Sequence, residues 1–114
     1  MNEFDILVSN EYYKKLLSDN ITDVVTLNNA KARKYKVGNH LTITNEETKE
    51  SFEIEIAGFL YFNNIADAFA MVGKRYLGFS GKTSTTKIED KFLESFKPQD
   101  VEKYGIVVIS YNKK

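Results

Sequence analysis

A compact group of cations occupies one short stretch of the chain. Lys31, Arg33, Lys34 and Lys36 fall within the segment KARKYK, which contains no acidic residue. Such a cluster can contact phosphates, because each cation adds salt-sensitive affinity for a polyanion that does not depend on sequence. Tyr35 lies between the cations and offers a ring that could stack on a base. A solvated basic loop would have the same composition, so both interpretations stay open.

Other polar side chains flank this basic segment. Asn28 and Asn29 precede it, and amide groups in a cleft can hydrogen-bond a base edge, although turn formation alone also explains them. His40 follows the segment, and an imidazole can act as an acid or base near neutral pH. A half-exposed strand histidine is the simpler interpretation, because the chain has no second His and no Cys to pair with it.

A glycine-containing loop carries a further phosphate-like pattern. Gly81-Lys82-Thr83 matches the end of a P-loop, but Tyr76 stands where that motif requires its first glycine. No strand precedes the pattern either. Binding of a nucleoside triphosphate is therefore not expected.

Composition narrows the classes of protein further. The 114 residues fit one domain spanning 1–114, and 16 basic residues balance 16 acidic ones, so no overall charge draws the protein to nucleic acid or membrane. The absence of Cys excludes disulfides, Cys-ligated zinc and thiol nucleophiles, and a lone His excludes a two-His metal site. We expect no metal and no cofactor.

Targeting features are also missing from the sequence. The opening residues MNEFDILVSNEYYKK carry acids where a secretion signal carries bases, and no long apolar core follows them. No apolar run approaches the length of a membrane span. The expected location is therefore the cytoplasm, without membrane attachment.

The positions of the candidate residues depend on a predicted series of strands and helices. Apolar, β-branched or alternating runs predict strands at residues 4–8, 21–27, 40–44, 51–56 and 106–111. The fourth should continue toward Tyr61 past a bend at Gly58, and the last should be central and buried. Residues 31–36 fit a loop or a strand edge, before a turn at Gly38 that needs positive φ.

Helical spacing and capping residues predict the helices. Residues 11–17 should form a short amphipathic helix with Asn10 as its N-cap. A second helix should start after Asn63 or Asn64 and stop at Gly73, and a third should start near residues 83–86 and end at Pro98. Residues 100–104 fit a turn or a short helical piece. This order predicts an α+β domain, a closed or nearly closed small β-barrel that is mostly antiparallel, with helices packed against it.

That order, together with particular residues, resembles the ASCH family of PUA-like domains. The matching segments are YYKKLLSDNITDVVTLN, KYKVGNHLTI, SFEIEIAGFLYF followed by NNIADAF, and EKYGIVVISY, which together cover nearly the whole chain. The resemblance implies a PUA-like β-barrel. For the superfamily it also implies binding of RNA or of a modified nucleotide.

The best-known ASCH signature, G-x-K-x-x-E-x-R, is degenerate here. Without gaps its four defined positions hold Asp19, Ile21, Val24 and Thr26, and a one-residue slip puts Ser18, Asn20, Asp23 and Val25 there. Neither register supplies the Lys or the Arg, and only the slip supplies an acid. The Asp usual in the family's turn is replaced by Asn39.

These departures bear on the activity that the resemblance implies. Some ASCH proteins resemble amidohydrolases of acetylated cytidine, whose motif Lys must be activated by burial or a neighbouring charge. Ile21 cannot do that chemistry, and Thr22 matches the family's Thr without an activator. Because late-barrel loops in the family lie near the motif strand, we expect a ligand cleft lined by Thr22, Thr26, Tyr61, Lys82 and Tyr104, although the two tyrosines also suit core or rim positions.

The sequence therefore favours a non-catalytic domain that binds RNA or a modified nucleotide. The expected contacts come from Lys31, Arg33, Lys34, Tyr35 and Asn28. One alternative is an amidohydrolase with a rearranged site that uses Lys82 or Glu89. Another is a protein-interaction module that uses the strand at 51–56 or an uncovered sheet edge.

Overall fold

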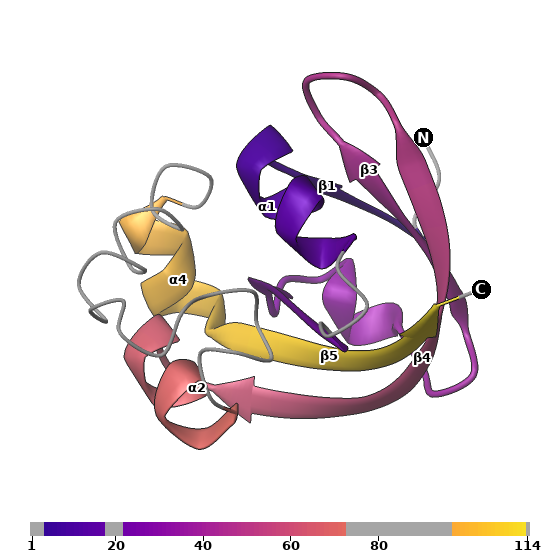
Figure 1. Ribbon diagram of the computed structural model, residues 1–114. Coiled ribbons are helices and arrows are strands. Elements are labelled where there is room, and N and C mark those ends of the chain that lie inside the picture. Colours follow the sequence, from indigo (N-terminus) through magenta and orange to yellow (C-terminus); the bar gives the residue numbers. More distant parts are fainter. Residues whose placement is uncertain (1–3, 18–21, 73–96, 114) are drawn as a thin grey trace.

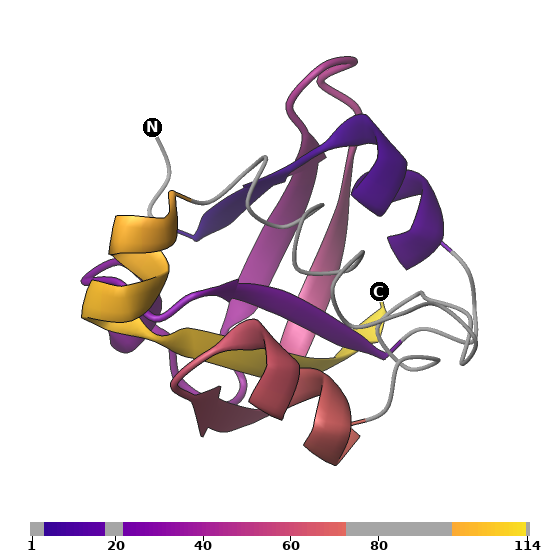
Figure 2. The ribbon, with the colours of Figure 1, turned by 90° about the vertical axis from the view of Figure 1, so that its left-hand side faces the viewer.

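A curled five-stranded sheet forms the framework of the protein, in a computed structural model that describes residues 4–17, 22–72 and 97–113 (Figure 1). The elements are β1 (Asp5–Val8), α1 (Asn10–Leu16), β2 (Asp23–Leu27), the short 3-10 helix η1 (Ala32–Lys34), β3 (His40–Asn45), β4 (Ser51–Phe62), α2 (Ile65–Val72), α4 (Pro98–Tyr104) and β5 (Ile106–Lys113). The sheet curls around α1, whereas α2 and α4 lie near one end of it (Figures 1 and 2).

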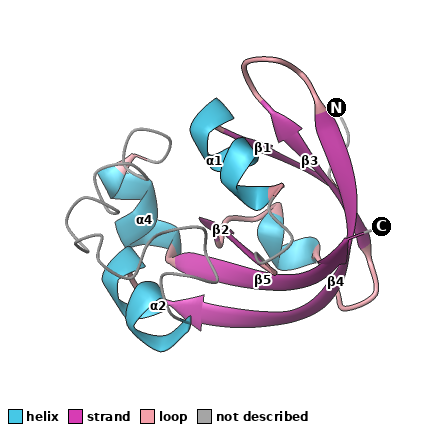
Figure 3. Cartoon of the chain, viewed as in Figure 1, coloured by secondary structure: helices cyan, strands magenta, loops and turns pink. Residues whose placement is uncertain are grey.

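Strand pairing within the sheet is mixed. The strands lie in the order β1-β3-β4-β5-β2, so β1 and β2 are the edges. β1 runs parallel to β3, whereas the β3–β4, β4–β5 and β2–β5 pairs are antiparallel. The α+β class is as predicted, and the described strands form an open half-barrel rather than a closed antiparallel barrel (Figure 3).

The long strand β4 allows the sheet to curl. It pairs with β3 over residues 51–55 and with β5 over residues 54–62, and its register with β5 shifts between Ile56 and Gly58. An extra residue in one strand bends that strand and increases the local twist. The bend predicted at Gly58 is therefore confirmed, and the strand continues past Tyr61 to Phe62.

Apolar side chains fill the hollow of the half-barrel. Leu16 of α1, Leu41 and Ile43 of β3, Ile54 of β4 and Ile109 of β5 are all fully buried. The first four residues of β5 are buried in succession, as expected for a strand that lies between β4 and β2. The predicted central buried strand is thus confirmed.

Side chains cover backbone groups on the two free edges of the sheet. The N–H of Val25 in β2 points away from β5 and donates to the hydroxyl of Tyr12, at 2.9 Å. On β1, the Lys31 ammonium donates to the carbonyl oxygen of Asp5. An exposed strand edge is a template for pairing with another chain, and these two contacts block it locally.

The start of α1 differs from the prediction by one residue. Ser9, not Asn10, is the N-cap, and its hydroxyl accepts from the N–H of Tyr12 at 3.2 Å. Asn10 is the first helical residue, and its Oδ1 accepts from the Asn45 side chain at 2.8 Å. A serine hydroxyl caps a helix as well as an asparagine amide does. The side-chain amide of Asn10 is used instead in the hydrogen bond with Asn45.

The other capping predictions have mixed outcomes. Asn64 caps α2 as expected, since its Oδ1 accepts from the N–H of Asp67 at 2.8 Å. Pro98 begins α4, because a residue without an N–H suits a first helical turn, and the helix expected to end before it lies outside the described residues. The stop expected at Gly73 and the helix expected from residues 83–86 lie outside the described residues. Residues 100–104 are helical, as the sequence allowed.

Candidate functional site

An open cleft of about 560 Å³ lies where the end of β4 meets α2 and α4. Figure 1 places these elements together at one end of the sheet. The side chains that matter for its chemistry are Asn28, Tyr61, Asn63, Asp67, Glu102, Lys103 and Tyr104. The cleft is thus built from parts of the chain that are distant in sequence.

Gly105 lines this cleft and has the most constrained backbone in it. Its backbone has φ of +75°, and a Cβ there would lie 2.8 Å from the carbonyl oxygen of Phe62. Its N–H donates to Val101 O at 2.9 Å, which ends α4, and its own carbonyl accepts from the N–H of Asn28 at 3.0 Å. Only glycine allows so close an approach in this conformation. Gly105 therefore holds α4, β4 and Asn28 together.

Two tyrosines give the cleft its aromatic surface. Tyr61 is 62% exposed, and its ring stacks on Phe59 with centroids 6.2 Å apart. The Lys103 ammonium lies over the ring of Tyr104, at 5.2 Å from its centroid. Planar ligands stack on such rings at little conformational cost.

Hydrogen-bond acceptors also line the cleft. Asp67 is fixed by Asn64, whose amide nitrogen donates to Asp67 Oδ2 at 3.2 Å. Glu102 is exposed on α4. The Oδ1 of Asn28 is buried and has no hydrogen-bond partner among the described residues.

The cationic segment at residues 31–36, here called the basic turn, is tied to the cleft. Arg33 donates from Nε to the carbonyl of Asn28 at 3.1 Å and from its main-chain N–H to Asn29 at 3.0 Å. Ala32 N–H donates to the Asn29 side chain at 3.0 Å, which fixes the start of η1. The basic turn therefore begins directly beside Asn28.

The cations of the basic turn are not equivalent. Arg33, Lys34 and Lys36 are exposed, whereas Lys31 is half-buried against β1. Because residues 32–34 form a 3-10 helix, the strand-edge alternative for this segment does not apply. Tyr35 is only 6% exposed, and its ring packs on Phe4 with centroids 5.7 Å apart. That packing leaves little of the Tyr35 ring on which a base could stack.

The structure brings together some of the residues expected in a ligand cleft. Tyr61 and Tyr104 line it, as does Asn28, which the sequence placed among the nucleic-acid contacts. Thr22 and Thr26 are not among the lining residues. Lys82 and Glu89 lie outside the described residues.

The positions of the ASCH signature fall on β2 and on the segment before it. Val24 and Val25 are core residues, and Thr26 pairs with Val107 of β5. Asp23, the acid of the slipped register, is 8% exposed. Its carboxylate accepts from Ser110 Oγ at 2.6 Å and from Thr22 Oγ1 at 3.0 Å. Two hydroxyl groups therefore satisfy the Asp23 carboxylate. The signature positions supply no Lys or Arg that could pair with it.

Sequence reasoning missed four polar residues of the cleft: Asn63, Asp67, Glu102 and Lys103. A signal was present for Asp67, because Asn64 and Asp67 have the spacing of a reciprocal helix cap. Glu102 gave no local signal. Glu102 lines the cleft only because α4 lies beside the end of β4 in the folded chain.

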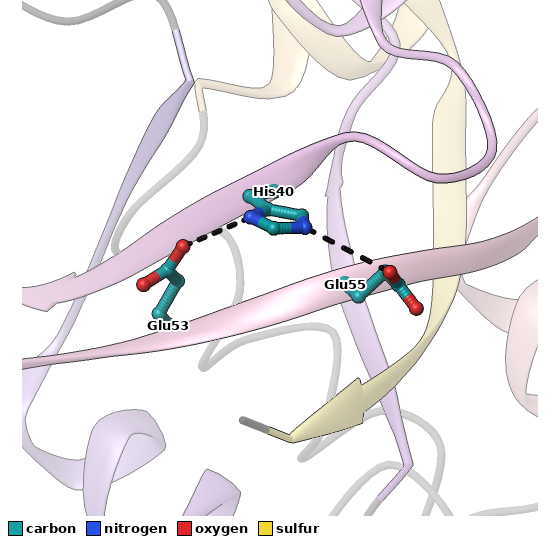
Figure 4. Close-up of polar contacts among 3 residues, drawn as sticks. All are labelled: His40, Glu53 and Glu55. Carbon is teal, nitrogen blue, oxygen red and sulfur yellow. Dashed lines mark ion pairs between the residues drawn. The ribbon is translucent and has the colours of Figure 1, made fainter.

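His40 lies away from the cleft on the exposed surface of β3. Its Nδ1 is 3.2 Å from Glu53 Oε1, and its Nε2 is 3.7 Å from Glu55 Oε1, as Figure 4 shows. The side chain is 46% exposed, in keeping with a half-exposed strand histidine. Within the described segments, no group of three or more His, Asp or Glu residues is arranged to hold a metal ion.

No helix in the described part of the chain is both long enough and apolar enough to cross a membrane.

The fold belongs to the small α+β domains built on a curled mixed sheet, and solved structures share it. The chain is similar to the crystal structure of hypothetical protein PH0355, with a TM-score of 0.78 and 17% identity over 96% of this chain and 97% of that one. It is also similar to the solution structure of PF0455 from Pyrococcus furiosus, with a TM-score of 0.67 and 17% identity over 96% of each chain.

A third similar structure is EF3133 from Enterococcus faecalis V583, of the family DUF984. Its TM-score is 0.62 at 16% identity, over 100% of this chain and 78% of that one. At these identities the likeness shows a common fold alone. No protein-family profile matches the sequence, and no curated protein matches it significantly.

Proposed function

We propose that the protein binds single-stranded RNA or a nucleotide without catalysis, with a base in the cleft and a phosphate on the basic turn. One observation carries the proposal. Asn28 joins the two surfaces, because its N–H donates to the carbonyl of Gly105, which lines the cleft, and its own carbonyl accepts from Arg33. A ligand that has a planar ring beside an anion matches that juxtaposition.

The cleft suits a base. Tyr61 presents a largely exposed ring, and single-stranded nucleic acids gain about 1–3 kcal/mol for each base that stacks on an aromatic side chain. The exposed amide of Asn63 borders the same space and can hydrogen-bond a base edge.

The basic turn suits a phosphate. Arg33 and Lys34 are exposed and lie on η1, which follows Asn28 closely in the chain. The cleft itself holds two carboxylates, Asp67 and Glu102, against the single cation Lys103. A phosphate is therefore better accommodated outside the cleft, on the basic turn.

Membership of the ASCH family of PUA-like domains forms part of this proposal. It is supported by the quoted segments of sequence and is compatible with the curled sheet. Hydrolysis of an acetylated or modified nucleoside finds no comparable support among the described residues, because core valines occupy signature positions and Asp23 is engaged by hydroxyl groups.

Charge neutralisation on the basic turn tests the proposal. We expect Lys34→Ala to weaken binding of a fluorescein-labelled nine-nucleotide oligouridine by about threefold to tenfold in an anisotropy titration at low salt. The dependence of log K on log salt should lose about 0.7 in slope, the value of one phosphate contact with a single strand. Arg33→Ala should weaken binding as well, although it also removes the hydrogen bond to Asn28.

Lys14→Ala is the matched control, because Lys14 is an exposed lysine on α1, apart from the basic turn. It should leave the affinity and the salt slope unchanged. Equal losses for Lys14→Ala and Lys34→Ala would indicate diffuse charge attraction and contradict a phosphate site. Absence of binding by the unaltered protein would overturn the proposed function.

A further inference from the structure

The cleft places an acidic and a basic side chain next to each other on one wall. Glu102 and Lys103 are consecutive residues of α4, and both line the cleft. Glu102 has no ion pair or hydrogen bond with another described residue, so both of its oxygens can accept from a ligand. The Lys103 ammonium is held over the Tyr104 ring and donates only.

Another element of the cleft, α2, adds an acceptor. Asp67 uses Oδ2 in its hydrogen bond with Asn64, which orients the carboxylate and leaves Oδ1. Carboxylate oxygens cannot donate, so the cleft favours a base edge that is rich in donors.

The four common bases differ in the edge that they would present here. Guanine presents the acceptor O6 beside two neighbouring donors, the N1–H and the N2 amino group. Uracil has one donor between two acceptors, and adenine and cytosine each place a single amino group beside an acceptor. Only guanine can give two hydrogen bonds to one carboxylate while its O6 or N7 accepts from a lysine.

We infer that the cleft selects guanine, with Glu102 accepting from N1–H and the N2 amino group and Lys103 donating to O6 or N7. This inference rests on the proposed function, since it assigns a base to the cleft that the proposed function describes. Tyr61 supplies the stacking surface, which is indifferent to base identity, and the charged pair supplies the discrimination.

Single-base replacement in an otherwise constant oligonucleotide tests the inference. The probe is a labelled nine-nucleotide oligouridine in which the central position is guanine, inosine, adenine or uracil, titrated by anisotropy. We expect the guanine form to bind about tenfold more tightly than the uracil form, as one bidentate contact provides. The inosine form should fall between them, because inosine keeps N1–H and lacks the N2 amino group.

Substitution of the acidic residue should remove the preference. Glu102→Gln is expected to lower the guanine-to-uracil ratio to less than about threefold, because an amide cannot accept from both N1–H and the N2 amino group. Glu53→Gln is the matched control, because Glu53 is exposed on β4 beside His40 and should leave the ratio unchanged. Circular dichroism of each variant checks that the fold is retained.

The outcomes separate the two proposals. If all four oligonucleotides bind equally and Lys34→Ala still weakens them, the guanine inference fails and the proposed function stands. A preference for guanine that survives Glu102→Gln would also overturn the inference. If no oligonucleotide binds, the proposed function itself fails.

Discussion

At the scale of single residues, Gly105 has the clearest structural requirement in the cleft. Its φ of 75° and ψ of −171° fall in a region that residues with a Cβ rarely adopt, and the Phe62 carbonyl oxygen lies only 2.8 Å from the position that a Cβ would take. The contact is with backbone, which cannot rotate away as a side chain can. The same residue accepts from Asn28 N–H, so its conformation positions the link between cleft and basic turn.

We predict that Gly105→Ala lowers the free energy of unfolding by about 2 kcal/mol or more, from the strained conformation and the close contact together. Urea denaturation followed by circular dichroism measures it. Gly58→Ala is the control, because nothing lies within 4 Å of a Cβ at Gly58, and it should cost less than about 1 kcal/mol. Similar losses for both variants would show that the Phe62 contact is not the cause.

At the scale of elements, α1 contributes more than apolar area. It supplies Leu16 to the core, packs Tyr13 on Phe52 of β4 with ring centroids 5.6 Å apart, and places the Tyr12 hydroxyl at the N–H of Val25. That N–H belongs to the edge strand β2 and is buried. One helix thus fills the hollow of the sheet and also satisfies a donor on its edge.

Two tyrosine substitutions separate these contributions. Tyr12→Phe keeps the ring and leaves the Val25 N–H without its acceptor, so we predict a loss of about 1–3 kcal/mol in the free energy of unfolding. Tyr111→Phe should be neutral or stabilising, because the Tyr111 hydroxyl is buried without a hydrogen-bond partner among the described residues. Thermal and urea denaturation of both variants gives the comparison, and a larger loss for Tyr111→Phe would contradict this account.

At the scale of the whole molecule, the same two tyrosines couple folding to alkaline pH. Burial raises the pKa of Tyr12 above its ordinary range, even though the hydrogen bond from Val25 acts in the opposite direction. Burial and the negative charge of Asp23 raise the pKa of Tyr111. The folded protein therefore holds both phenol protons at a pH where the unfolded chain has released them.

We predict that stability is unaffected by these groups below a pH of about 10, the ordinary tyrosine value, and falls as the pH rises above it. The sign follows because the unfolded state binds fewer protons there than the folded state. Each tyrosine contributes a slope of up to about 1.4 kcal/mol per pH unit. Urea denaturation between pH 8 and 11 measures the slope, and Tyr111→Phe should reduce it. An unchanged slope in that variant would contradict a role for Tyr111.

Local pattern was sufficient for most elements of the fold. Alternation in β4, the buried apolar run of β5, the cap at Asn64 and the positive φ at Gly38, which is 91°, all follow from interactions within a few residues. Predictions failed where a distant partner competes with a local one. Asn10 is engaged by Asn45 while Ser9 caps α1, and Tyr35, between exposed cations, is drawn into the core beside Phe4.

The sequence by itself determined the five strands, the helices α1 and α2, and the cationic composition of residues 31–36, because these depend on side-chain periodicity and local backbone preference. Only the tertiary structure decided that Asn28 meets Gly105, that Glu102 and Asp67 border one cleft, and that β1 and β2 are edges covered by Lys31 and Tyr12. Those contacts join distant segments, and they are set by strand register and core packing, which no local pattern encodes.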